Sequence, residues 1–210
     1  LFQGATQCRA LSPTIGDDRL SAIDFHGLGE AECEVVDPII TGGSKNAPDA
    51  TTRTAIKFGN TSHRVGPYRC RVLGAAVSEY KGASSRVVMM EPGQEESVVR
   101  GLQADDIETL FYFSDNSSAA TLVSKRGSIE EAVVNGCNNR VVDIHGGRNG
   151  STTKTLEDFT LRDVRLYGTS KLLTIRQVNG IKLLRIMVDN HTIDATEPYF
   201  CTAIDITKFI

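Results

Sequence analysis

Hydrophobic and polar residues alternate two positions apart along much of the chain, in short phrases that end at turn residues. The phrase Leu161–Gly168 lies over Leu183–Asn190 at a separation of 22 residues, with apolar side chains at matching positions. The phrase Val142–Gly146 fits the same register as a third copy. A period of two is typical of a strand with one buried face, and glycine and asparagine tolerate the positive φ of a tight turn.

A short repeat that carries strands predicts a stack of similar units, each lying on the one before it. Related strand phrases occupy residues 22–27, 55–59, 172–175 and 203–206, and a second kind occupies 33–36 and 70–74. Two strands per unit, separated by sharp polar turns, predict an all-β fold, a parallel β-helix (solenoid) with coils of about 22 to 30 residues. A helical solenoid fits poorly, because the apolar period is not 3.6.

Two segments lack clean alternation. Residues 93–110 are interpreted as a loop or a short helix. Ser128–Glu131 matches a capping box, and Asn135 followed by Gly136 would end a helix, so a short helix is predicted over residues 129–135.

A competing interpretation of the fold comes from the segment Gly66–Val72. Its Tyr68 stands two residues before Cys70, as in the Tyr-x-Cys strand of immunoglobulin domains, and Cys33 could be the disulfide partner. The chain contains no tryptophan, and the same segment fits the repeat pattern, so the parallel β-helix is the preferred prediction.

The repeat between Phe159 and Asn190, which closes with the letters NGIKLLRIMVDN, resembles right-handed β-helix proteins of the pectin-lyase-like superfamily. That group includes polysaccharide lyases, polygalacturonases and phage tailspikes. The resemblance covers the repeat pattern over about two thirds of the chain and points to no single family. It implies a right-handed coil and carbohydrate ligands, and the likeness to tailspikes implies that a homotrimer is one assembly to expect.

Length and composition set the domain count. The 210 residues, 40% of them hydrophobic, suffice for one domain with a core. Residues 1–4 resemble the remnant of a picornaviral 3C protease site of the kind used in expression tags, and residues 5–210 are predicted to form one β-helix domain. The pattern stops in mid-phrase at Ala203–Ile210, as it would in a fragment of a longer protein.

The charge pattern bears on partners. The chain has 23 basic and 26 acidic residues, a net charge of −3, with no long run of like charge. Nucleic acid is therefore not expected as a partner, and no apolar run is long enough for membrane insertion. A polysaccharide or cell-surface glycan is the expected partner.

The cysteine and histidine positions exclude the familiar metal motifs. The five cysteines are Cys8, Cys33, Cys70, Cys137 and Cys201, too far apart in sequence for a CxxC site. The histidines form no HxH or HExxH pattern. We therefore predict no metal and no cofactor, and expect Cys33, Cys70 and Cys137 to be buried.

Four N-x-[ST] sequons begin at Asn60, Asn116, Asn149 and Asn190, each at an expected turn. They favour glycosylation and an extracellular protein, on a cell surface or a virion surface. The alternative is that turns are simply rich in Asn, Ser and Thr.

The assumed register places two polar columns on the outside of the stack. One contains Asp143, Arg165 and Met187, and the other contains His145, Tyr167 and Asp189. Such a strip suits a sugar polymer, with Arg165 and Tyr167 as substrate-binding residues, because rings stack on sugars and charged groups hydrogen-bond to hydroxyls or uronates.

Catalysis by this strip is the alternative hypothesis. Two carboxyls can hydrolyse a glycosidic bond at separations of about 5 to 9.5 Å, and Asp143 and Asp189 are the candidates. In a lyase, Arg165 or calcium would neutralise the uronate and His145 would act as the base. The structural alternative is that Asp143 and Arg165 form a plain cross-strand ion pair. No complete catalytic set is present, so a binding or structural module of viral-fibre, tailspike or adhesin type is the preferred prediction.

Overall fold

The computed structural model describes ten parts of the chain: residues 4–16, 21–26, 29–42, 53–59, 66–82, 84–114, 123–145, 156–176, 181–189 and 204–206. All regular structure in these parts is β-strand, and they contain no helix that could cross a membrane. Fifteen of the strands form one sheet, in which every pairing is parallel.

The sheet has three faces, which the chain visits in turn. Strands of the first face are β1 (Arg9–Leu11), β4 (Glu34–Val36), β7 (Arg71–Leu73) and β10 (Val98–Arg100). Strands of the second face are β2 (Thr14–Gly16), β5 (Ile39–Thr41) and β8 (Ala76–Ser78). Strands of the third face are β3 (Ser21–Phe25), β6 (Arg53–Phe58), β9 (Ser85–Met90) and β17 (Ile204–Ile206).

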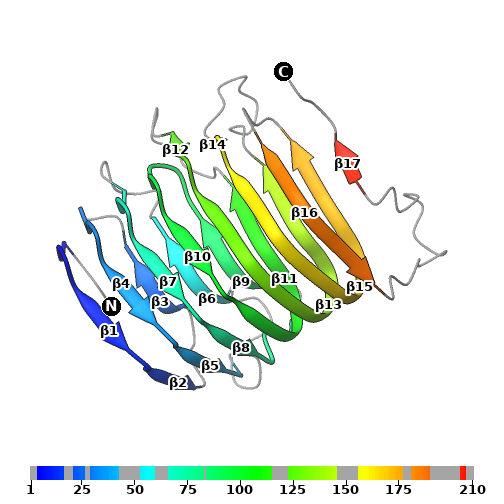
Figure 1. Cartoon of the computed structure of the whole chain (residues 1–210), viewed down its shortest axis with the longest axis horizontal. Coiled ribbons are helices and arrows are strands. Elements are labelled where there is room, and N and C mark those ends of the chain that lie inside the picture. The colour runs from blue at the N-terminus through cyan, green and yellow to red at the C-terminus, as the bar shows by residue number, and fades with distance from the viewer. Residues whose placement is uncertain are drawn as a thin grey trace.

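Longer strands continue from one face to the next. They are β11 (Gln103–Ser114), β13 (Ser128–His145), β15 (Thr160–Arg176) and β16 (Lys182–Asp189). A separate two-stranded sheet pairs β12 (Ser124–Lys125) with β14 (Leu156–Glu157). Figure 1 shows the strands side by side from β1 to β16, so each pass of the chain forms a row beside the previous row.

Residues paired across neighbouring rows form columns. The first column consists of Arg9, Glu34, Arg71, Val98, Ser128, Thr160 and Lys182. The row spacing in this column ranges from 22 residues, between 160 and 182, to 37 residues, between 34 and 71. The repeat is therefore regular in space but irregular in sequence.

Residues with positive φ separate the faces of each row. All thirteen non-glycine residues with positive φ in the described parts fall at three corners, spaced five residues apart. In the row that contains β13 these corners are Arg126 (φ 53°), Glu131 (φ 57°) and Gly136 (φ 73°). One left-handed residue turns the chain without ending the pairing, because its own amide donates to the neighbouring row, as that of Arg126 does to Glu157.

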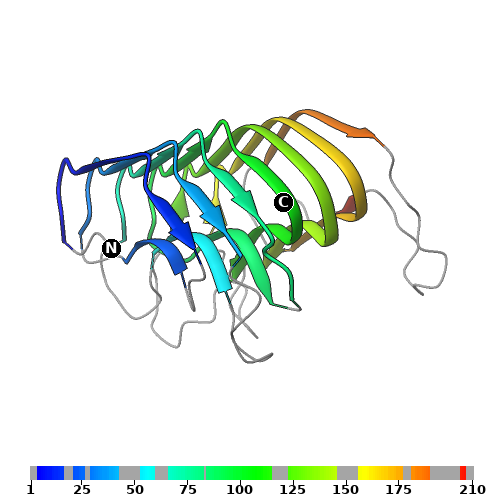
Figure 2. The same ribbon diagram turned by 90° about the horizontal axis from the view of Figure 1, so that it is seen from below.

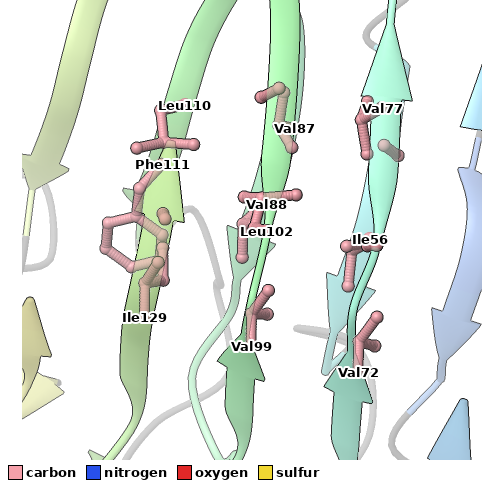
Figure 3. Close-up of a cluster of buried hydrophobic side chains, with 14 of the residues drawn as sticks. Ile56, Val72, Val77, Val87, Val88, Val99, Leu102, Leu110, Phe111 and Ile129 are labelled. Atoms are coloured by element: carbon pink, nitrogen blue, oxygen red, sulfur yellow. The ribbon is translucent and has the colours of Figure 1, made fainter. Parts of the chain in front are cut away.

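The core lies inside the curve of the sheet. The column Val35, Val72, Val99, Ile129 and Leu161 is at most 1% exposed. Figure 3 shows Val72, Val99 and Ile129 in successive strands of this column.

Figure 2 shows that the long strands bend around this interior. The rings of Phe111 on the third face and Phe159, just before β15 on the first face, stack at 4.4 Å with an angle of 5° between their planes. The two faces therefore pack against each other.

The prediction of an all-β fold with parallel strands is confirmed, and the predicted local helix is wrong. Residues 129–135 belong to β13, and residues 93–110 contain β10 and most of β11. The capping-box pattern failed because Ile129 and Ala132 are needed as inward-facing residues in a strand. The immunoglobulin alternative is also wrong, because Tyr68 pairs in parallel with both neighbouring rows.

The 22-residue register is confirmed only for β15 and β16, where Val164 pairs with Ile186. Its extension to Val142 is wrong, because Val142 pairs with Leu173 and Ala132 occupies the position beside Val164. The inward orientation was predicted correctly, since Val142 and Val164 are fully buried and Ile186 packs against the core. Alternation with a period of two looks the same after a shift of ten residues, so the pattern did not determine the register.

Charged side chains of alternating sign follow the outer columns. At the first corner, Arg69 lies 2.7 Å from Glu96, and Arg126 lies 2.8 Å from Glu96. On the first face, Arg100 and Arg162 each donate to Oε2 of Glu130 at 2.6 Å. Neighbouring rows are thus joined outside the core as well as inside it.

The carboxylates of these networks have lowered pKa values. Burial acts to raise the pKa of Glu130, but hydrogen bonds from Arg100, Ser128 and Arg162 outweigh burial and leave the pKa lowered. The pKa of Glu96 is lowered because Arg69 donates a hydrogen bond to it. A carboxyl whose pKa is lower in the folded chain stabilises the fold above its unfolded pKa and loses this contribution as the pH falls.

We expect Glu130→Gln to lower the free energy of unfolding by about 2 kcal/mol at pH 7, because two arginines lose their charged acceptor. The difference from the wild type should shrink as the pH falls below 4.5, the ordinary value for Glu130. Urea denaturation at pH 7 and pH 3 measures both quantities. Glu95→Gln is the control, since the Glu95 side chain is 40% exposed and its one ion pair within the described residues is with Arg126, and it should change stability by less than about 0.5 kcal/mol.

A difference between Glu130→Gln and the wild type that does not change with pH would contradict this account. Glu108 works in the opposite direction, because burial raises its pKa and its protonation at low pH favours the fold. Glu108 is unchanged in both proteins, so its effect cancels in the comparison.

Candidate functional site

The second face carries the part of the predicted strip that the structure keeps together. Arg165 pairs with Val133 and Met187, and Tyr167 pairs with Asn135 and Asp189. Arg165 and Tyr167 stand two residues apart on β15, so their side chains leave the same side of the sheet. The strip on this face therefore consists of two adjacent columns, and Asp143 and His145 are in neither.

A hollow of about 460 Å³ lies over this face. It is lined by Glu131, Ala132, Val133, Asp163, Arg165, Arg185 and Met187. The corner residues Glu131, Asp163 and Arg185 form one side, because their positive φ turns their side chains away from the core. The columns of the second face form the floor. The hollow is thus built from three neighbouring rows, β13, β15 and β16.

Charges in the hollow are unevenly paired. Arg185 donates to Asp163 at 2.6 Å, and this hydrogen bond lowers the pKa of Asp163. Within the described residues, the exposed side chain of Arg165 has no hydrogen-bond or ion-pair partner. A guanidinium left free in a concave site presents five N–H donors to a ligand.

An apolar surface lies beside the free guanidinium. Met187 is 61% exposed, one of four large hydrophobic residues exposed in the described part of the chain. It is the neighbour of Arg165 in the column, and Tyr167 is half-buried in the next column. A methionine and a phenol beside an arginine provide both the apolar contact and the hydrogen bonds that a sugar ring needs.

Asp143 and His145 lie on the third face instead. Asp143 pairs with Tyr112 and Thr174, and His145 pairs with Ser114 and Arg176. The predicted contact between Asp143 and Arg165 is wrong, since Asp143 lies 2.7 Å from Arg140 on its own strand. The assumed register was ten residues out, since Val133 and not Asp143 pairs with Arg165. Asp143 lies beyond the corner at Gly136, on the next face.

The third face carries a column of five residues, three of them charged. The column runs through Asp24, Lys57, Met89, Tyr112 and Asp143, so the Asp-x-His motifs at Asp24 and Asp143 occupy equivalent places four rows apart. Asp143 is only 8% exposed. Asp143 and Asp189 are on different faces, so the structure does not bring the proposed carboxyl pair together.

Several charged side chains of the third face are paired with one another. Nζ of Lys57 lies 3.2 Å from Oε2 of Glu91, and Nδ1 of His26 lies 3.1 Å from Oδ2 of Asp24. Arg86 stacks over Tyr112 at 3.4 Å from the ring centroid. Burial lowers the pKa of Arg86, the direction expected for a cation removed from water.

Metal and thiol chemistry find little support in the described parts. These parts contain no group of three or more His, Cys, Asp or Glu placed to hold a metal ion. The predicted burial of Cys33, Cys70 and Cys137 is confirmed. Burial raises the pKa of Cys70 and of Cys137 to about 12, so both thiols stay protonated and unreactive at neutral pH.

Asn60, Asn116, Asn149 and Asn190 lie outside the described residues, as does Cys201. For His145 and Asp189 only the backbone is described. Glu131, Asp163 and Arg185 were not predicted as site residues from the sequence. The one signal that could have found them is a corner with positive φ every five residues along a row. Most corner residues are not glycine, so this spacing is not visible in the sequence.

No protein-family model matches the chain, and no curated protein sequence is significantly similar to it.

Proposed function

We propose that the chain is a right-handed parallel β-helix and acts as a carbohydrate-binding module of a secreted or surface-displayed protein. Support for the coil comes from parallel pairing in every row and from Phe111 and Phe159, which pack the first and third faces together. The hand follows from the strong preference for right-handed crossovers between parallel strands. The relation to the pectin-lyase-like superfamily is part of this proposal.

The observation that carries the proposed activity is the free Arg165 in the hollow of the second face. A glycan lying across the rows would place a hydroxyl or uronate on the guanidinium and an apolar sugar face on Met187. Rows about 4.8 Å apart present such groups at a regular spacing. A linear polymer of similar units is therefore a suitable ligand.

A binding module is preferred to an enzyme because one of the two carboxylates in this hollow is held in an ion pair. Glu131 and Asp163 are in neighbouring rows, and Asp163 accepts a hydrogen bond from Arg185 in the row on its other side. Asp143 and His145 are on another face, so the hydrolase and lyase alternatives lack a common site.

Surface display is the second part of the proposal. A stack joined by core and ion-pair columns suits a rod of viral-fibre, tailspike or adhesin type, and three such rods could form a homotrimer. Buried thiols are compatible with an oxidising compartment, because a thiol with a pKa of about 12, as in Cys70, forms almost no thiolate. Native mass measurement before and after deglycosylation checks both the compartment and the assembly. An unchanged mass and a monomer would contradict this part.

We expect Arg165→Ala to weaken glycan binding about tenfold, the effect of losing charged hydrogen bonds of about 1.4 kcal/mol. An array of neutral and acidic polysaccharides identifies the ligand class, and calorimetry with oligogalacturonate measures the affinity. Arg9→Ala is the matched control, since Arg9 is exposed and lies at the other end of the stack.

Absence of binding to every polysaccharide, or equal affinity in Arg165→Ala and wild type, would overturn the proposed function. Release of reducing ends or unsaturated uronates from the same polysaccharides would favour the enzyme alternative. Loss of that turnover in Asp143→Ala and Asp189→Ala would then assign the catalytic activity to these two carboxylates.

A further inference from the structure

A second hollow, of about 440 Å³, lies on the first face, on the other side of the corner formed by Glu131 and Asp163. Its lining residues are Arg69, Arg71, Glu96, Val98, Arg126, Ser128, Glu130, Asp158, Thr160 and Lys182. None of them was predicted as a site residue from the sequence, and none belongs to the site on the second face.

The shape of this hollow follows from the first column. Val98, Ser128 and Thr160 occupy three successive rows and have short side chains. The long side chains of Arg71 and Lys182 stand on either side of these three in the same column, at the two ends of the hollow. Four row spacings of about 4.8 Å place these two ends about 19 Å apart. The result is a trough that crosses the strands with a cation at each end.

The carboxylates beside the trough are already occupied. Glu96 is held by both Arg69 and Arg126, and its lowered pKa keeps it ionised in these ion pairs at neutral pH. Glu130 is held by two arginines in the same way. Arg126 also pairs with Glu95, and Arg69 lies 3.8 Å from Glu32, so the charges of this corner are engaged with one another and leave no surplus of positive charge.

The cations at the two ends are free. Within the described residues, the side chains of Arg71 and Lys182 have no hydrogen-bond or ion-pair partner, and both are exposed. Asp158 is the one lining carboxylate that is also exposed and has no side-chain partner within the described residues. The unpaired charges of the trough are therefore two positive and one negative.

We propose that this trough binds a linear anionic saccharide, bearing sulfate or carboxylate groups, with Arg71 and Lys182 contacting anionic groups about 19 Å apart. The hydroxyl of Thr160 and the methyl groups of Val98 form a floor that suits the body of a sugar chain. The ten lining residues include no aromatic ring, which a single-stranded nucleic acid would use for base stacking. The inference does not depend on the function proposed for Arg165.

The test is calorimetry with a sulfated hexasaccharide, compared with the disaccharide of the same composition. The wild type should bind the hexasaccharide, and Arg71→Ala and Lys182→Ala should each weaken it about tenfold. Asp158→Asn should strengthen it about threefold, because it removes the one opposing free charge. The disaccharide cannot reach both cations and should bind as weakly as the hexasaccharide binds the doubly substituted protein.

Arg165→Ala separates this site from the site on the second face and should leave hexasaccharide binding unchanged. Thermal melts check folding, and Arg71→Ala and Lys182→Ala should melt like the wild type, since both side chains are exposed and unpaired. Equal binding of the hexasaccharide to the wild type and to both of these variants would overturn the proposal. Equal binding of the two saccharides, or tighter binding of a single-stranded oligonucleotide, would overturn it as well.

Discussion

Replacing Phe111 with alanine is expected to lower the free energy of unfolding by about 4 kcal/mol. Phe111 is fully buried, and its ring stacks on that of Phe159 at 4.4 Å. The substitution removes the apolar surface that the phenyl group buries on folding, and it leaves a cavity between two faces of the sheet. Urea denaturation followed by far-ultraviolet circular dichroism measures the loss.

Phe25→Ala provides the comparison within the core. Phe25 is also fully buried and stacks on Phe58 at 5.0 Å, but both rings are in one column of the third face. It belongs to the first row, which contacts a neighbour on one side only. In a stack of rows, such a row can open without the rest, so the measured loss is limited to the cost of opening it. We expect a smaller loss than for Phe111→Ala.

A double-mutant cycle tests the packing between the faces directly. Phe111→Ala and Phe159→Ala should show a coupling energy of about 1 kcal/mol, because each removes the other's aromatic partner. Additive losses would mean that the first and third faces do not pack together, and the closed coil under the proposed function would then lose its main support.

The inward and outward orientation of strand residues was predictable from the sequence. Burial of Val142, Val164 and Leu166 follows from alternation alone, because a strand offers only two sides. Parallel pairing was predictable as well, since similar phrases repeat at intervals too long for tight hairpins.

The register was not predictable, and the candidate site depends on it. The connections between rows vary in length, so the separation is 22 residues from Thr160 to Lys182 but 32 from Ser128 to Thr160. A bulge between Cys137 and Arg140 then changes the offset within one strand. One well-matched pair of rows therefore predicted Arg165 beside Met187 correctly, and the same offset misplaced Asp143.

The positions of the corners could not be predicted from the hydrophobic pattern either. Left-handed φ values are expected at glycine, yet Arg69, Glu96 and Arg126 adopt them at one corner. These residues are held there by pairing on both sides and by the ion pairs between their side chains. Both hollows border such corners, so the sites could be identified only from the backbone conformation of the folded chain.

Gly66→Ala is expected to destabilise the chain by about 3 kcal/mol, although Gly66 is outside every strand. A Cβ at this position would lie 1.9 Å from the carbonyl oxygen of Gly93 and 2.1 Å from its carbonyl carbon. Both contacts are with backbone, which cannot rotate away as a side chain can. The neighbouring amide of Glu95 donates to Pro67 at 2.9 Å, so separating the two segments also breaks row pairing.

Gly168→Ala is the matched control for Gly66→Ala. Gly168 has a φ of 61°, and an added Cβ would meet no atom within 4 Å. The same corner holds Glu79 and Asp106 in other rows at φ values of 60° and 55°, so a side chain is tolerated there. The expected cost is about 1 kcal/mol, that of a left-handed residue with a Cβ. If Gly168→Ala proved the more damaging of the two, backbone conformation at the corners, and not close approach between rows, would limit how tightly the rows stack.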